Sequence, residues 1–85
     1  MSEYIDLIIR NRKGILLQTQ VDSFSSYNAK GKFDILPRHA NFISLVEKLI
    51  TYTDKADKDK KLKEFRIERA LLKVSINKAE VFIGL

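Results

Sequence analysis

The only histidine and the only proline of the chain lie two residues apart, within the stretch GKFDILPRHANFISLV at residues 31–46. A histidine can act as a general base or bind a metal ion, but both roles need further side chains that converge on it. Asp34 is the nearest carboxylate, and nothing in the sequence directs it toward His39. We therefore interpret His39 as a surface residue in a turn, with no metal and no catalytic role.

The rest of the sequence offers no other reaction signature. It has no cysteine, which excludes disulfides and thiolate metal sites. Its three glycines are too few for a phosphate cradle, and the motifs of nucleotide-binding loops and zinc proteases do not occur. Ser23, Ser25 and Ser26 lie in a predicted strand, with no histidine nearby in sequence. We expect a protein without catalytic residues and without a cofactor.

Two basic runs stand out in a chain whose net charge is +5. Residues 54–63, DKADKDKKLK, hold five lysines and three aspartates, and RNRK at residues 10–13 directly precedes Gly14. Runs of this kind are usually solvated turns, and that is the interpretation favoured for both. Phosphate binding by these runs is the alternative.

Length and composition indicate one small domain that spans residues 1–85. Hydrophobic residues make up 45% of the chain and charged residues 32%, a mixture typical of globular proteins. No apolar run approaches the roughly 18 residues needed to cross a bilayer. The N-terminus lacks a basic region ahead of its apolar segment, so no signal peptide is predicted. We expect a soluble intracellular domain that is a monomer when isolated.

Apolar residues alternate with a period of two along most of the chain, which is typical of strands with one buried face. Turn signals recur every eight to twelve residues, a spacing that favours an antiparallel β-sandwich or barrel. The expected fold is all-β, an antiparallel β-sandwich of about eight to ten short strands. Most of the core is predicted to come from Ile5, Leu7, Ile9, Leu36, Leu45, Leu72, Val74, Val81 and Ile83.

One segment, residues 59–74, also fits a helix, because several of its apolar residues have helical spacing. Strand is preferred there, since Ile67, Val74 and Ile76 favour strands and the alternation continues past the helical match. In the opening stretch, Gly31 is expected in a tight turn with positive φ. Phe33 and Ile35 should share one face of the strand that follows, and Pro37 should end that strand because it cannot donate a ladder hydrogen bond.

The order of these elements resembles the N-terminal β-sandwich domain of the F-type ATP synthase ε subunit, which is called δ in mitochondria. The family pattern G-E-[LF]-G-[VI]-L-P-[GN]-H-A-P falls in register on residues 31–41, and the closing hairpin of the family is similar to RALLKVSINKAEVFIGL at residues 69–85. The resemblance covers essentially the whole chain. The helical hairpin that follows in the family has no counterpart in these 85 residues, so its inhibitory movement and ATP site are not carried over.

The chain also departs from the family pattern at several positions. Lys32 replaces an acidic residue, Asp34 replaces a glycine, and Arg38 stands where glycine or asparagine is usual. Arg69 and Ala70 replace a double glycine before the closing hairpin, so we expect the backbone to bend differently there.

The resemblance implies a non-catalytic subunit of the central stalk, which couples the rotor ring of a proton- or sodium-driven ATP synthase to the catalytic head. One sheet would pack on the γ subunit, and one loop would face the membrane c-ring. The implied c-ring-facing residues are Gly31, Lys32, Pro37, Arg38, His39 and Ala40. The expected location is the cytoplasmic face of the inner or plasma membrane of a bacterial-type cell, with membrane contact only through the complex.

Two other functions stay open on the sequence alone. A small basic β-barrel could bind RNA or DNA, with lysines and arginines on the phosphates and exposed aromatic rings as stacking platforms. Against it, most of the aromatic residues lie on strand faces expected to form the core. A free-standing regulatory domain with another partner is the remaining alternative.

Overall fold

The computed structural model describes residues 4–37 and 41–84, and these residues form six strands. The expected count of eight to ten short strands is therefore wrong for this part of the chain, although the all-β class is confirmed. Three of the strands are long, with thirteen to fifteen residues each. The strands are β1 (Ile5–Asn11), β2 (Gly14–Asn28), β3 (Gly31–Ile35), β4 (Phe42–Asp54), β5 (Leu62–Ser75) and β6 (Lys78–Ile83).

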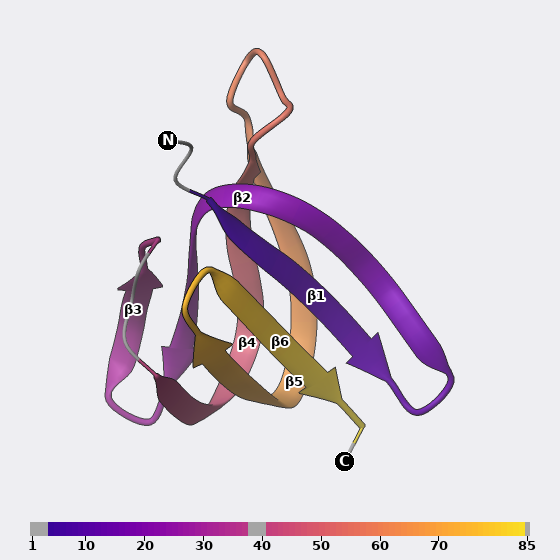
Figure 1. Cartoon of the computed structure of the whole chain (residues 1–85). Coiled ribbons are helices and arrows are strands. Elements are labelled where there is room, and N and C mark those ends of the chain that lie inside the picture. The colour runs from indigo at the N-terminus through magenta and orange to yellow at the C-terminus, as the bar shows by residue number, and fades with distance from the viewer. Residues whose placement is uncertain (1–3, 38–40, 85) are drawn as a thin grey trace.

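The strands form one sheet that curls into a closed, barrel-like sandwich (Figure 1). Their order is β1-β6-β5-β4-β2-β3, and an additional pairing between β1 and β2 closes the ring. Among the described residues, β3 pairs with β2 alone and forms an edge. All pairings are antiparallel except that of β1 with β6, which is parallel.

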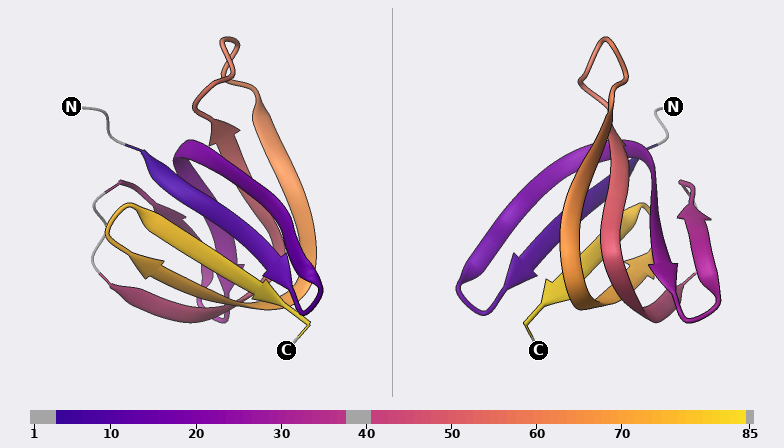
Figure 2. Two further views of the ribbon diagram at one scale, coloured as in Figure 1. Left: turned by 45° about the vertical axis from the view of Figure 1, so that its right-hand side comes forward. Right: turned by 180° about the vertical axis from the view of Figure 1, so that it is seen from behind.

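Bulges explain why a few long strands replace many short ones. An extra residue in one strand bends the strand and increases its twist without ending the pairing. In the β4–β5 pair, Glu47 lies opposite Arg69 and Leu49 opposite Arg66, so Lys48 alone faces two residues of β5. Lys48 has a φ of 74°, which is rare for a residue with a side chain. The two strands thereby pass from one layer of the sandwich to the other, as the views in Figure 2 show. Arg69 and Ala70 directly follow this bulge, and the expected difference from the family's backbone there stays a prediction.

The core lies inside the closed sheet. Six of the nine predicted core residues are buried, namely Ile5, Leu7, Ile9, Leu72, Val74 and Val81, and Ile83 is half-buried against them. Leu36 and Leu45 were predicted wrongly, with exposed fractions of 61% and 71%. Leu36 lies just beyond the end of β3, whose last residue, Ile35, is buried. Leu45 lies on the outer face of β4, because its neighbour Val46 faces the core.

Other local expectations are confirmed. Gly31 has a φ of 118°, in the turn that joins β2 to β3. Ile35 is buried and Phe33 packs against the core, with its ring 5.6 Å from that of Phe42 on β4. The segment that could have been a helix is strand β5 for all its residues from Leu62 onward. No helix in the described residues is long and apolar enough to span a membrane.

Candidate partner-binding surfaces

The loop residues named from the resemblance do not form one cluster in the described part of the chain. Gly31 and Lys32 begin β3, opposite Asn28 and Tyr27 of β2. Pro37 lies two residues beyond the other end of β3. The five residues of β3 extend over about 13 Å, so Lys32 near its start and Pro37 beyond its last residue lie at opposite ends of this strand. Arg38, His39 and Ala40 lie outside the described residues.

The side chains that could have done chemistry near this loop have structural partners. Asp34 accepts a hydrogen bond from the hydroxyl of Ser25, its cross-strand neighbour on β2, at 2.5 Å. Ser26 is fully buried and donates to the carbonyl oxygen of Leu49 at 3.0 Å, next to the β4–β5 bulge. Within residues 4–37 and 41–84, no group of three histidines or carboxylates could hold a metal ion.

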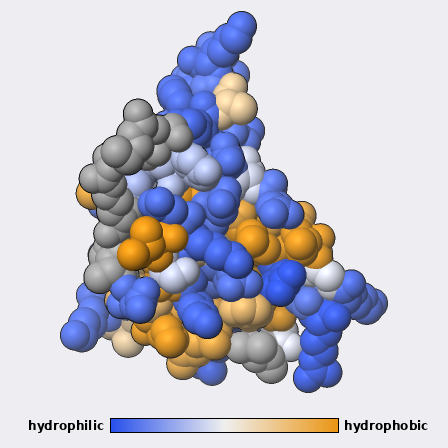
Figure 3. Space-filling model, in the orientation of Figure 1, coloured by the Kyte–Doolittle hydropathy of each residue, from blue (hydrophilic) through white to orange (hydrophobic). Residues whose placement is uncertain are grey.

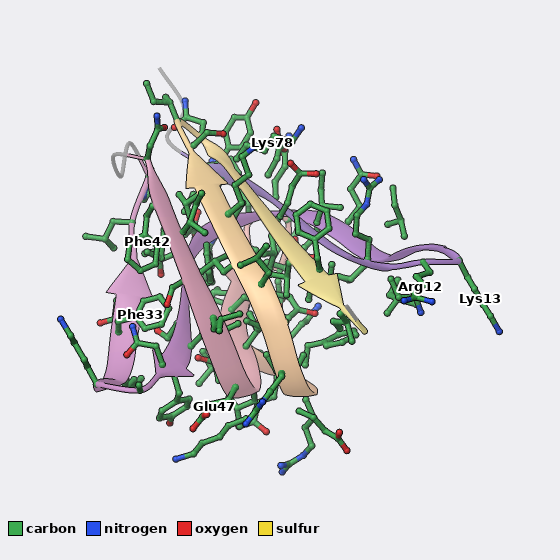
Figure 4. All side chains as sticks on the ribbon, turned by 90° about the horizontal axis from the view of Figure 1, so that it is seen from below. Arg12, Lys13, Phe33, Phe42, Glu47 and Lys78 are labelled. Carbon is green, nitrogen blue, oxygen red and sulfur yellow. The ribbon has the colours of Figure 1, made fainter. Side chains whose placement is uncertain are left out.

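An apolar surface lies on the outside of the sheet, where β4, β5 and β6 run side by side. Leu45, Leu71 and Phe82 are direct cross-strand partners, so their side chains form a row on one face. Ile43 begins the next row and is 66% exposed. We call these four residues the outer face. Figure 4 views the molecule from this side, with the three strands in front.

The outer face continues into a groove beside the β4–β5 bulge. Two consecutive residues of β5, Glu68 and Arg69, are exposed there, while Ile67 before them and Ala70 after them are buried. Leu45 of β4 and the end of β6 complete the lining, together with Arg66. In Figure 3, hydrophobic side chains gather along the lower edge of the molecule, where these strands lie. The surface is apolar in its centre and carries arginines at its border, which suits a protein partner.

The basic run at residues 54–63 forms the tip of the β4–β5 hairpin and is held by its own aspartates. The Ala56 amide donates to Asp54 at 2.9 Å, and the hydroxyl of Thr19 on β2 donates to the other oxygen of this carboxylate at 2.9 Å. These two hydrogen bonds, with Lys63 and Lys60 nearby, hold the pKa of Asp54 below its usual value. The run is therefore an ordered element and does more than fill a solvated turn.

Further contacts attach this tip to β2. The ammonium group of Lys60 lies 2.9 Å from a carboxylate oxygen of Asp22 and donates to the carbonyl of Lys55 at 3.1 Å. The amide of Lys55 donates to the carbonyl of Gln20 at 2.8 Å. Since the aspartates neutralise much of its charge, this run is a poor candidate for phosphate binding.

The run at residues 10–13 forms the tip of the β1–β2 hairpin and differs in its charge. Asn11 orders the turn by accepting hydrogen bonds from the amides of Lys13 and Gly14, at 2.8 and 3.2 Å. Arg10 pairs with Glu80 at 3.8 Å. Arg12 and Lys13 are exposed, and neither forms an ion pair with any residue that the structure describes. The charge of this run is therefore not matched by an acidic side chain within the described residues, unlike that of the run at residues 54–63.

Together these features describe a small all-β partner-binding domain with an exposed apolar face. The family model for the β-sandwich domain of the ATP synthase delta/epsilon chain matches residues 4–83, and the chain belongs to this family. The family is a non-catalytic component of the ATP synthase stalk, as the resemblance implied, and it works in a membrane-associated complex. The match favours the stalk hypothesis over nucleic-acid binding.

Solved structures show the same fold at low sequence identity. A chain of the Euglena gracilis mitochondrial ATP synthase, from a structure of OSCP, F1 and the c-ring, is 13% identical and superposes with a TM-score of 0.82 over 98% of this chain. A chain from the central stalk and c-ring of the Tetrahymena thermophila mitochondrial ATP synthase is 7% identical, with a TM-score of 0.75 over 95%. The present chain spans 52% and 63% of those two chains. No curated protein matches it.

Proposed function

We propose that residues 1–85 act as the N-terminal β-sandwich domain of an ε-type subunit, which binds γ and the c-ring and so couples the rotor to the catalytic head. The observation that carries this proposal beyond the family is the exposed outer face. Ile43 and Leu45 expose 66% and 71% of their surface, which is unusual for two large aliphatic residues on neighbouring outward positions of one strand. Covering them with γ removes this apolar surface from water.

The second contact of the proposal is with the c-ring, through Gly31, Lys32, Pro37, Arg38, His39 and Ala40. Because Lys32 and Pro37 lie at opposite ends of β3, these residues are best tested in two groups. Lys32→Ala changes one end, and Arg38→Ala with His39→Ala changes the segment after Pro37. Loss of ring assembly with either variant, without loss of folding, would assign the contact to that end of β3. Loss with neither would remove the c-ring from the proposal.

The γ contact is tested by the double variant Ile43→Ser/Leu45→Ser. Both side chains are exposed, so the variant should fold with little change in stability. We expect its affinity for the purified γ subunit of the same organism to fall at least about tenfold, since full burial of an Ile or Leu side chain contributes about 1.5–3 kcal/mol. Isothermal titration calorimetry gives the affinity directly.

The chain offers a matched control on another surface. Ile15 and Leu16 on the β1–β2 hairpin are about half exposed, and Ile15→Ser/Leu16→Ser removes a similar pair of aliphatic side chains. This control should bind γ like the wild type. Equal losses in both variants, or unchanged affinity of the outer-face variant, would contradict the proposed γ contact.

A further inference from the structure

The tip of the β1–β2 hairpin combines cations with exposed aliphatic side chains. Arg12 and Lys13 occupy the turn, and Ile15 and Leu16 follow with 49% and 50% of their surface exposed. We call these four residues the β1–β2 tip. No aspartate or glutamate occurs between residues 7 and 21, so no acidic side chain of this hairpin segment offsets the two cations.

A bulge explains why two consecutive aliphatic residues point outward. Ile9 pairs with Leu17 and Arg10 with Ile15, so Leu16 is an extra residue of β2 without a partner of its own. A bulge changes the direction of the side chains that follow it. Without it, one of two neighbouring strand residues would face the core. The sequence thus places both aliphatic groups at the surface, next to the cations.

The tip projects away from the rest of the molecule. In Figure 4, Arg12 and Lys13 lie at the far end of the hairpin, beyond the strands that carry the outer face. A shallow hollow beside the turn is lined by Asn11, Arg12, Lys13, Ile83 and Gly84. Ile83 and Gly84 also line the groove of the outer face, so a partner there would lie next to the tip, whereas Arg12 and Lys13 do not line that groove.

We propose that the β1–β2 tip binds the surface of an anionic lipid bilayer, with Arg12 and Lys13 on lipid phosphates and Ile15 and Leu16 inserted among the headgroups. Basic side chains next to apolar ones are the combination that interfacial membrane binding requires. Membership in a family that works in a membrane-associated complex places a bilayer within reach.

The test uses the whole chain and vesicles of two compositions, phosphatidylcholine alone and phosphatidylcholine mixed with phosphatidylglycerol. Flotation should show binding to the mixed vesicles only, and binding should weaken as salt rises. Arg12→Ala/Lys13→Ala should lower the partition coefficient about 25-fold, or about fivefold for each cation removed. Ile15→Ser/Leu16→Ser should lower it about tenfold, and Arg12→Lys should leave it nearly unchanged.

Two controls separate the tip from general effects of charge and hydrophobicity. Lys58→Ala/Lys61→Ala removes two exposed cations from the β4–β5 hairpin, and Ile43→Ser/Leu45→Ser removes the aliphatic groups of the outer face. Neither control should change vesicle binding. The proposal is overturned if the wild type does not prefer anionic vesicles, or if Lys58→Ala/Lys61→Ala weakens binding as much as the tip variant.

Two further results distinguish lipid binding by the tip from protein binding by the tip and from γ binding by the outer face. If the wild type ignores vesicles while Arg12→Ala/Lys13→Ala weakens binding to a detergent-solubilised c-ring, the tip binds protein and the lipid proposal is wrong. Calorimetry with γ is independent of the vesicle assay. Lipid binding can therefore fail while γ binding by the outer face holds, or hold while γ binding fails.

Discussion

The two hairpin tips are both basic in sequence but differ in how the fold treats their charge. In the β4–β5 tip, Asp54 receives two hydrogen bonds and Lys60 pairs with Asp22, so the cations belong to an internal network. In the β1–β2 tip, Arg12 and Lys13 have no ion pair within the described residues and lie beside exposed aliphatic groups. The first tip stabilises the fold, and the second is available to a partner. A basic run therefore indicates binding only when its charge is not already matched within the fold.

The two tips should differ most in how much the side chain that orders each turn, Asp54 or Asn11, contributes to the free energy of unfolding. Asp54→Ala removes hydrogen bonds to a charged carboxylate from both the hairpin and β2, and should lower the free energy of unfolding by about 1–2 kcal/mol. Asn11→Ala removes only local, neutral hydrogen bonds and should cost about 0.5–1 kcal/mol. Urea denaturation gives the free energy of unfolding of each variant, and the two losses relative to the wild type can then be compared. A larger loss for Asn11→Ala would reverse the comparison.

The same aspartate should make the β4–β5 tip sensitive to acid. Its pKa in the folded protein is lowered, so its carboxylate contributes stability above the unfolded value of about 3.9 and loses that contribution as pH falls through the folded value. The difference in stability between wild type and Asp54→Asn should be constant at neutral pH and shrink below about pH 4. A difference that grows on acidification would contradict the lowered pKa.

A smaller difference is expected for the cations themselves. Lys60→Met breaks an exposed ion pair with Asp22 and should cost about 0.5 kcal/mol, less at high salt. Lys13→Met removes an unpaired charge and should change stability by less than that. Thermal unfolding at low and high salt compares the two variants. A salt-dependent loss in Lys13→Met would show that its charge is matched after all.

The sequence predicted the strand faces well wherever one face is apolar and the other polar. Ile5, Leu7 and Ile9 are buried as expected, and Asp6 marks the opposite face of their strand as polar. Ile8, the second residue between them, is apolar and is also buried, which the alternation did not predict. The alternation fails where apolar residues occupy both faces. In ISLV, the pattern does not tell whether Leu45 or Val46 is the inward residue, and the closed sheet buries Val46.

Neighbouring apolar residues on one strand were also the sequence feature from which the exposed outer face could have been predicted. Leu45 beside Val46 and Leu71 beside Leu72 are apolar neighbours on opposite faces of their strands, and each pair has one member inside and one outside. The bulges at Leu16 and Lys48 had no such signal, because the period-two pattern of one strand does not show where it gains or lacks a residue relative to its partner. By contrast, the position of Lys32 and Pro37 at opposite ends of β3 follows from the predicted turn at Gly31 and the predicted strand end at Pro37.

The central claim, that the outer face binds γ, is most directly tested by site-specific cross-linking. The chain has no cysteine, so Leu45→Cys and Leu16→Cys each introduce one exposed thiol that can carry a photoreactive maleimide. After reconstitution into the ATP synthase and illumination, the account predicts that the label at Leu45→Cys cross-links to γ and that the label at Leu16→Cys does not. A γ adduct from position 16 alone, or from neither position in an assembled complex, would contradict it.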